Sequence, residues 1–197
     1  MGAFMLLSAT TFSQQEQGQS VVSGGVGYSL IGAIFSADVS GQTTVENFSS
    51  PVICASYDYG ITENFSLGGA LGWQRMGQDW SDYTWLDIDE NGDLVEVTED
   101  FEYRLTRTAI GARALFHYGK KENLDLYSGA RVNYVIWDVD ATTTDQDWLD
   151  GNGQVSGVGF QLIAIGGRAY FNEMLGANFE LAFGAPYLLA VGVCAKL

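Results

Sequence analysis

The chain has 197 residues, of which 47% are hydrophobic and 13% aromatic, and its formal net charge is −15. This hydrophobic content excludes an intrinsically disordered chain, and the length predicts a single domain. Nine Lys and Arg residues stand against 24 Asp and Glu residues. Nucleic acid is therefore excluded as a partner, because its binding depends on cations that neutralise phosphates.

The N-terminal segment MGAFMLLSATTFSQ joins an apolar run to small residues. This pattern is typical of a secretory signal peptide, although the positively charged start is missing. We expect a partial signal peptide at residues 1–14 and one domain over residues 18–197. The alternative is an ordinary N-terminal strand. After this segment, no apolar run has the length of a transmembrane helix.

Alternation of apolar and polar residues dominates the rest of the chain and favours β-strands. Eight segments show it: 20–35, 50–61, 65–78, 100–119, 124–139, 154–171, 176–184 and 187–197. Tight turns are expected at 62–64, 120–123 and 172–175, and long polar loops at 36–49, 79–99 and 140–153. The connection at Ala185-Pro186 is also short. Tight turns at one rim and long loops at the other are typical of outer-membrane barrels.

The two faces of these segments differ in composition. In 124–139, Leu126, Ala130, Val132, Tyr134 and Ile136 alternate with Asp125, Tyr127, Gly129, Arg131 and Asn133. Segment 187–197 likewise places Tyr187, Leu189, Val191 and Val193 on an apolar face. A soluble sandwich also alternates, but its outer face would carry many charges. Here the non-apolar face is mostly small residues and isolated charges, which suits a narrow lumen, so we expect the apolar face to meet lipid. Segment 154–171 is apolar on both faces at Ile163 and Ile165, which leaves its register open.

Three stretches read as strands in which glycine stands beside aromatic residues: YDYGITENFSLGGALGW at 57–73, LYSGARVNY at 126–134 and GGRAYFNEMLGANFELAFG at 166–184. Through them the chain resembles the outer membrane protein A/X-like family over about residues 18–197. The resemblance implies an all-β fold, a transmembrane up-and-down antiparallel β-barrel of 8 strands. It also implies a place in the outer membrane of a Gram-negative bacterium, with the loops extracellular.

The C-terminal residues GVCAKL are similar to the insertion signal of this family. This implies recognition of the C-terminal strand by the assembly machinery, although Leu197 replaces the usual terminal aromatic residue. The resemblance implies no activity, because the family includes adhesins, stability factors and enzymes.

The expected lumen face carries isolated charges. Because an unpaired charge is costly in a water-poor interior, we expect these groups to pair. Glu180 is expected to pair with Arg131 or Arg113 and to fill the bore. The alternative is a narrow pore for small solutes, gated by these pairs. The expected lumen charges are Glu180, Arg131, Arg113, Arg107, Asp58, Asp125 and Lys196.

Most of the acidic residues fall in two loops, at 79–102 and 138–150. Our hypothesis is that two acidic, aromatic hairpins protrude from the membrane and offer an edge or a tip to a protein partner. The alternative is a solvated charged rim that only prevents aggregation. The candidate interaction residues are Trp80, Tyr83, Trp85, Asp87, Asp89, Asp93 and Trp148.

Residues 87–93 begin like a calcium loop. Thr98 stands at the twelfth position, where such a loop needs glutamate, so we expect a plain Asn-Gly turn.

The single histidine, His117, maps beside the turn at 120–123, which argues against a His-based enzyme facing the outer rim and favours a structural role. Cys54 and Cys194 map to different depths and are expected to stay unbonded. We expect no catalytic centre, no cofactor and no metal site.

Aromatic residues cluster by rim in the expected barrel. All five tryptophans map towards the long loops, and a second group maps near the tight turns. Two aromatic girdles follow from this distribution. The second group is Tyr57, Tyr59, Phe65, Phe116 and Tyr118.

Overall fold

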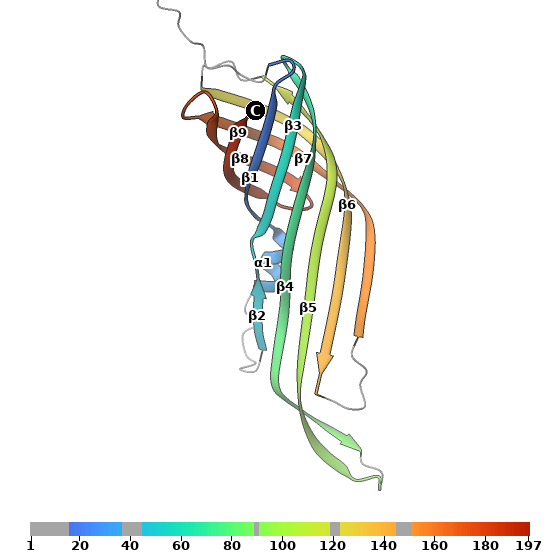
Figure 1. Cartoon of the computed structure of the whole chain (residues 1–197). Coiled ribbons are helices and arrows are strands. Elements are labelled where there is room, and N and C mark those ends of the chain that lie inside the picture. The colour runs from blue at the N-terminus through green and yellow to red at the C-terminus, as the bar shows by residue number, and fades with distance from the viewer. Residues whose placement is uncertain (1–15, 37–44, 89–90, 119–122, 145–150) are drawn as a thin grey trace, which may run out of the picture.

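The structure is a computed structural model that describes residues 16–36, 45–88, 91–118, 123–144 and 151–197 (Figure 1). The expected signal peptide at 1–14, Asp89 and Trp148 lie outside these ranges, as do residues 37–44, 119–122 and 145–150 of the expected connections. No described helix is long and apolar enough to cross a membrane. The described elements are β1 (Ser20–Tyr28), α1 (Leu30–Ser36), β2 (Val45–Ser49), β3 (Val52–Thr62), β4 (Phe65–Ile88), β5 (Leu94–His117), β6 (Leu124–Thr143), β7 (Gly151–Tyr170), β8 (Leu175–Gly184) and β9 (Leu189–Lys196).

Eight of the strands close into a ring. Their order is β4-β3-β1-β9-β8-β7-β6-β5, and β5 pairs back onto β4. Every pairing is antiparallel, and β1 next to β9 joins the two ends of the chain. The short strand β2 also pairs with β4 and continues the line of β3 beyond Ser50 and Pro51. The expected eight-stranded up-and-down barrel is therefore confirmed.

The barrel is apolar outside and polar inside. The outward side chains of β9 and β8 are exposed, among them Val193 at 67% and Phe183 at 56%. The inward positions hold buried charged and polar groups, including Arg113, Glu180 and Gln74. A water-soluble fold would show the reverse distribution. The expected assignment of faces is thus confirmed for the ring.

Helix α1 replaces the C-terminal part of the first expected strand. Strand β1 ends at Tyr28, and Ser29 caps the helix, because its Oγ accepts a hydrogen bond from the N–H of Gly32 at 2.9 Å. The sequence Leu30–Phe35 is apolar almost throughout and has no alternation, so it carries no strand signal. The prediction of a strand to residue 35 is wrong there. The expected loop at 36–49 is also wrong in part, because its end forms β2.

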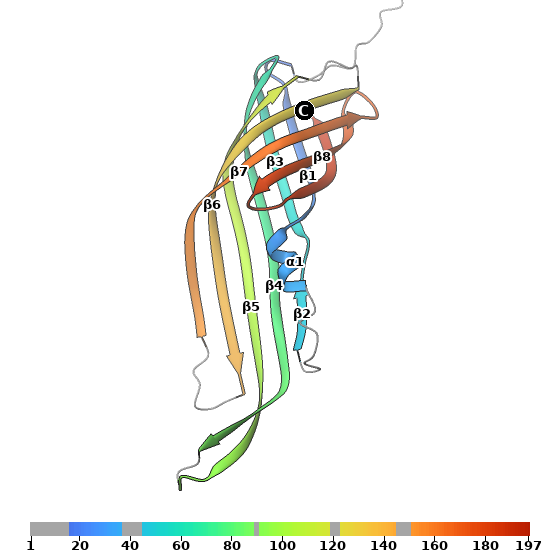
Figure 2. The ribbon, with the colours of Figure 1, turned by 180° about the vertical axis from the view of Figure 1, so that it is seen from behind.

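The other expected long loops are largely paired strands. The β4–β5 ladder runs to Ile88 opposite Leu94, and β5–β6 pairing runs to Phe101 opposite Thr143. β8 reaches only to Gly184, opposite Gln161 of β7. The long strands therefore continue past the closed ring as an open sheet, visible as the long ribbons of Figures 1 and 2. We call this part the extension: Val45–Ser49, Arg75–Ile88, Leu94–Thr106, Asp138–Thr143 and Gly151–Ser156.

A bulge in β7 settles the register that the sequence left open. The pairing of β7 with β8 shifts between Ile163 and Ile165, and the pairing of β6 with β7 shifts nearby. The extra residue moves the inward positions from odd to even numbers. Ile163 is therefore buried inside, whereas Ile165 is exposed and Arg168 points inward.

Two glycines allow the strands that join the chain ends to approach closely. Gly25 of β1 and Gly192 of β9 lie opposite each other. A Cβ on Gly25 would meet the backbone of Val191 and Gly192, and a Cβ on Gly192 would meet the backbone of Gly24 and Gly25. Backbone atoms cannot move aside as a flexible side chain can, so this contact requires glycine.

We expect Gly25→Ala to lower the free energy of unfolding by about 1–3 kcal/mol, because the added methyl group overpacks the β1–β9 contact. The urea midpoint of the refolded barrel, followed by tryptophan fluorescence, measures this loss. Gly157→Ala on β7 is the matched control, since a Cβ there would have no atom within 4 Å. Equal midpoints for the two variants would contradict the expectation.

Candidate functional site

The centre of the barrel is built around Glu180. Its Oε1 lies 2.6 Å from Nη2 of Arg113 and accepts a hydrogen bond from the Tyr127 hydroxyl at 2.9 Å. Its Oε2 lies 3.5 Å from Nη2 of Arg131 and accepts a hydrogen bond from the Tyr187 hydroxyl at 2.6 Å. All five side chains are buried. The structure thus brings both candidate arginines onto Glu180.

A second group of charges continues from Arg113 towards the turn side. Nε of Arg113 lies 3.1 Å from Oδ1 of Asp58, and the other oxygen of Asp58 pairs with Nη2 of Arg168. Nη1 of Arg168 lies 3.4 Å from Oδ2 of Asp125. The network therefore contains three carboxylates, on Asp58, Asp125 and Glu180, and three guanidinium groups. Equal numbers of opposite charges make their burial tolerable.

Arg107 does not join this network. It lies at the loop-side mouth, where Nη2 donates to Oε1 of Gln74 at 2.7 Å and to the carbonyl oxygen of Pro186. Its guanidinium carbon lies 5.4 Å from the ring centre of Trp137. Lys196 lies at the other end, with Nζ 4.0 Å from the ring centre of Tyr170. The expected lumen charges are therefore all inside, but they form separate groups.

The interior around Glu180 is filled by side chains. Rings cover the guanidinium groups: Tyr127 lies over Arg113 and Arg168, and Tyr187 over Arg131. The space left beside Glu180 has a volume of about 10 Å³. One water molecule needs about that much room, so the described side chains leave no passage for a solute at this level.

His117 belongs to a hydrogen-bonded row near the turn side. Its Nε2 lies 2.8 Å from Oγ of Ser66, and its Nδ1 lies 2.8 Å from Oδ1 of Asp125. Serine, histidine and aspartate in this order resemble a hydrolase triad. Ser66 is 0% exposed, however, and Asp125 is shared with Arg168. A substrate cannot reach this hydroxyl, and the arrangement supports the structural role expected for His117.

The two cysteines are free, as expected. The expected cause of their separation was a difference in depth. The structure adds a second cause, because β1 lies between β3, which carries Cys54, and β9, which carries Cys194.

The expected tryptophan girdle is wrong. Of the tryptophans in the described ranges, Trp73 alone lies on the outer face of the ring. Trp137 shares the inward parity of its strand and packs against Arg107, and Trp80 and Trp85 lie in the extension. The second group is placed as expected, because Tyr57, Tyr59, Phe116 and Tyr118 are exposed near the turns.

The extension carries an aromatic cluster on the face that continues from the lumen. The ring centres of Trp80 and Tyr83 are 5.5 Å apart, and those of Tyr83 and Trp85 are 5.8 Å apart. Phe101 lies 5.8 Å from Trp85 and 6.4 Å from Tyr83. Beside Trp80 and Tyr83 lies a cavity of about 360 Å³, which residues 101–103 and 141–143 complete.

The opposite face of the extension carries acidic side chains, and Leu86, Ile88 and Leu94 are exposed on it near the tip. Arg104 pairs with Asp79 and, at 3.4 Å, with Glu102. The hydrogen bond that Arg104 donates to Asp79 raises the pKa of the Arg104 guanidinium above its usual value. The other acidic side chains on this part of the chain include Asp100, Asp138 and Asp140.

The tip of the β4–β5 hairpin is a turn in its described part. Oδ1 of Asp87 accepts a hydrogen bond from the N–H of Ile88 at 2.7 Å, and Gly92 has a φ of 87°. Such a φ favours glycine. Asp93 follows in the turn before β5. Among the described residues, no cluster of His, Cys, Asp or Glu has the arrangement of a metal site.

Two members of the interior network were missed by the sequence analysis. Arg168 was not assigned to the lumen because the bulge at Ala164 reverses the parity of its strand. Tyr187 was assigned to the apolar face, but β9 begins only at Leu189. Pro186 has no N–H for a ladder, so strand parity does not extend to Tyr187, and this residue turns inward. The apolar residues on both faces of segment 154–171 were the available signal for the bulge.

No family model matches the chain, and neither does any curated protein sequence. Solved structures that are similar include Ail, the attachment invasion locus protein of Yersinia pestis, in complex with the heparin analogue sucrose octasulfate. The identity is 11%, the TM-score is 0.47, and the match covers 91% of this chain and 95% of Ail. A second structure of Ail gives 13% identity over the same shares and a TM-score of 0.46.

The N-terminal β-barrel domain of Pseudomonas aeruginosa OprF is also similar, with 15% identity and a TM-score of 0.42. The match covers 93% of this chain and 100% of that domain.

Proposed function

We propose that this chain is an integral barrel of a bacterial outer membrane that presents the extension at the cell surface as an interaction platform. One observation carries the membrane part: the outer face of the closed ring is apolar and exposed, while six charged groups pair inside it. In water such a distribution would expose a large contiguous apolar surface, which soluble monomeric proteins rarely show. In a bilayer it is the distribution that a spanning barrel requires.

The extension supports the interaction part. Residues 151–156 of β7 pair with β6 on one side. No described strand pairs with their other side, since β8 reaches only to Gly184. An unpaired strand edge can accept an extended segment of a partner through backbone hydrogen bonds. The exposed Val155 would give such pairing a side-chain component.

The outward face of β9 supports insertion from the turn side. The outward residues of β9, Val191 and Val193, are exposed and spaced two apart. A strand of this kind is a surface that the assembly machinery can recognise, although Leu197 stands where the family has an aromatic residue. In this orientation the extension lies on the extracellular side.

A pore is the weaker alternative. The charges that would gate it are paired with one another and covered by rings, and the remaining volume beside Glu180 is about that of one water molecule. A filled interior favours an anchor that holds the extension in place.

The interaction part is tested by removing the hairpin. Replacing residues 79–102 with an Asn-Gly turn between Gln78 and Tyr103 shortens the extension while leaving the ring intact. A photoreactive amino acid at Val155 should yield a protein adduct on intact cells with the full chain, and this adduct should be lost in the shortened chain.

The matched control places the same photoreactive residue at Phe179, an outward position of β8, where adducts with lipid are expected in both chains. Equal protein adducts at Val155 with and without the hairpin would contradict a role for the hairpin in the interaction. Recovery of either chain outside the outer-membrane fraction would contradict the membrane part.

A further inference from the structure

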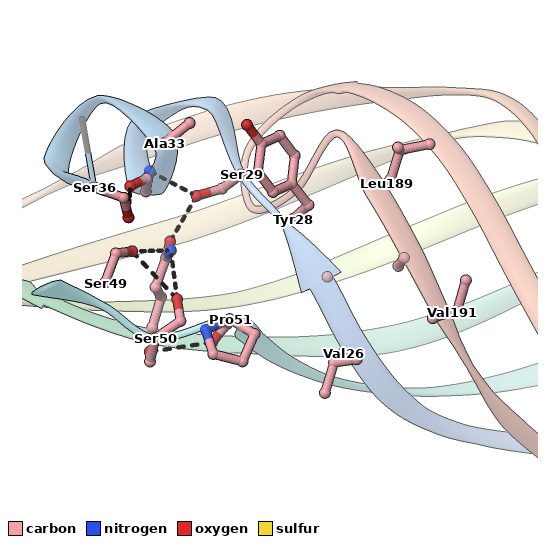
Figure 3. Close-up of a pocket in the computed structure, with 14 residues that line it drawn as sticks. Val26, Tyr28, Ser29, Ala33, Ser36, Ser49, Ser50, Pro51, Leu189 and Val191 are labelled. Carbon is pink, nitrogen blue, oxygen red and sulfur yellow. Dashed lines mark hydrogen bonds between the residues drawn. The ribbon is translucent and has the colours of Figure 1, made fainter. Parts of the chain in front are cut away.

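A groove opens in the outer surface of the barrel beside α1 (Figure 3). Its volume is about 540 Å³, within the range of about 300–1,000 Å³ that small-molecule sites occupy. It arises because β1 leaves its neighbour at this point. The β1–β3 ladder ends at Gly27 opposite Val52, and the chain after Tyr28 forms α1 in place of a strand.

One part of the groove is apolar and belongs to the outward face of the ring. Val26 and Tyr28 of β1 line it together with Leu189 and Val191 of β9. These four side chains are between 45% and 59% exposed. They stand at the loop-side end of the outward apolar run on each strand. If the chain spans a membrane, as proposed above, the natural occupant of this part is an acyl chain.

The other part of the groove is polar and held in place by hydrogen bonds. Ser29 donates from Oγ to Oε1 of Gln74 at 2.9 Å, and Nε2 of Gln74 donates to Oγ of Ser49 at 3.2 Å. Nε2 of Gln74 also donates to the carbonyl oxygen of Ser50 at 3.0 Å. Ser29 and Gln74 are buried, so the apolar part ends at a fixed polar wall. Hydroxyl oxygens with spare lone pairs, on Ser36 and Ser49, stand at its rim.

The head group that fits this wall is uncharged. The described residues that line the groove include no Lys, Arg, Asp or Glu. An anionic head would lose water there without gaining a cation, on a chain whose net charge is −15. Hydroxyl groups, in contrast, can exchange hydrogen bonds with serine and glutamine side chains.

We infer that this groove binds a single-chain amphiphile with an uncharged, hydroxyl-bearing head group, taken from the bilayer with its acyl chain along β1 and β9. The inference rests on the proposed place of the chain in a membrane. It does not depend on any partner of the extension.

The test uses the full chain in lipid nanodiscs and a monoacylglycerol that carries a diazirine in its acyl chain. After irradiation, mass spectrometry compares labelling of residues 26–36 with labelling of the reference residue Phe179 on β8. We expect saturable labelling at 26–36, which an excess of unlabelled monoacylglycerol lowers at least about fivefold by mass action. Labelling at Phe179 should not saturate. Uniform, non-saturable labelling over both regions would overturn the inference.

The head group is tested by competition with lysophosphatidylglycerol, which has the same kind of tail and a glycerol but adds a phosphate. It should compete much less well than monoacylglycerol, and equal competition would overturn the assigned head group. Ala33→Trp, which fills the groove, should lower labelling at 26–36 by at least about fivefold, since binding to the filled groove is lost. Ala177→Trp on β8 is the matched control and should not change it.

Failure of the membrane proposal gives a different result. If the barrel does not contact the bilayer, the reference residue Phe179 stays unlabelled as well. If only the groove inference is wrong, Phe179 is labelled and the signal at 26–36 does not saturate. The competition uses the unmodified chain, so the result does not depend on whether Ala33→Trp folds.

Discussion

Replacing Glu180 with alanine is expected to lower the free energy of unfolding by about 3–5 kcal/mol, the cost of breaking a buried ion pair by removing one partner. The substitution leaves Arg113 and Arg131 buried without their carboxylate. It also removes the acceptor of the Tyr127 and Tyr187 hydroxyl groups. Urea unfolding of the barrel in lipid vesicles, with the folded fraction read from its electrophoretic mobility without boiling, measures the loss.

Asp140→Ala is the matched control for Glu180→Ala. Asp140 is an exposed carboxylate at the end of β6, and we expect its removal to leave the urea midpoint within experimental error, because exposed charges contribute little to stability. If Glu180→Ala also left the midpoint unchanged, the buried network would not be what holds the interior together.

Conductance in planar bilayers should stay at background for the native chain, because the network fills the bore.

The second large effect is expected on the outer face. Val132→Arg places a charge near the middle of the outward run of β6, where Val132 is 48% exposed. In a bilayer this is the hydrocarbon layer, and an arginine there costs about 2–4 kcal/mol. The same vesicle-based unfolding experiment measures the change in midpoint.

Leu86→Arg provides a control with the same new side chain. Leu86 is more exposed than Val132, but it lies in the extension, beyond the outward apolar run of β4. We expect little change in stability, since the added charge stays in water. Equal losses for the two variants would show that exposure, and not contact with lipid, determines the cost.

The ring of eight strands could be predicted because alternation, glycine and turn residues all indicate the same fold. The faces followed from composition, since isolated charges such as Glu180 and Arg131 alternate with apolar residues. The pairing of Glu180 was accessible for the same reason: a narrow lumen leaves a carboxylate few partners other than arginine.

Other features depended on local departures from strand parity. The bulge at Ala164 moved Arg168 inside, and the turn before β9 moved Tyr187 inside. Neither shift is visible from a period of two. Helix α1 lies in a run that is apolar throughout, which strands and helices share, so its type could not be decided by alternation.

The sequence predicts loops for most of the extension because this part of the chain is acidic. Charge density is a usual mark of a loop, but acidic side chains can also stand on the exposed faces of a paired hairpin. The alternation of Val95 and Val97 with charged neighbours was the available strand signal. The acidic residues at 79–102 outweighed this signal. The groove beside α1 could not be predicted either, because it depends on the point at which β1 separates from β3.

The central claim is that the outward side chains of the ring contact hydrocarbon and the inward ones do not. Spin labels at five consecutive positions of β6, Val132 to Ile136, test it most directly, in a background where Cys54 and Cys194 are replaced by serine. In bilayers, labels at 132, 134 and 136 should be reached by oxygen and not by a water-soluble nickel complex, while labels at 133 and 135 should be shielded from both. Uniform access of the nickel complex, or the inverse alternation, would contradict the claim.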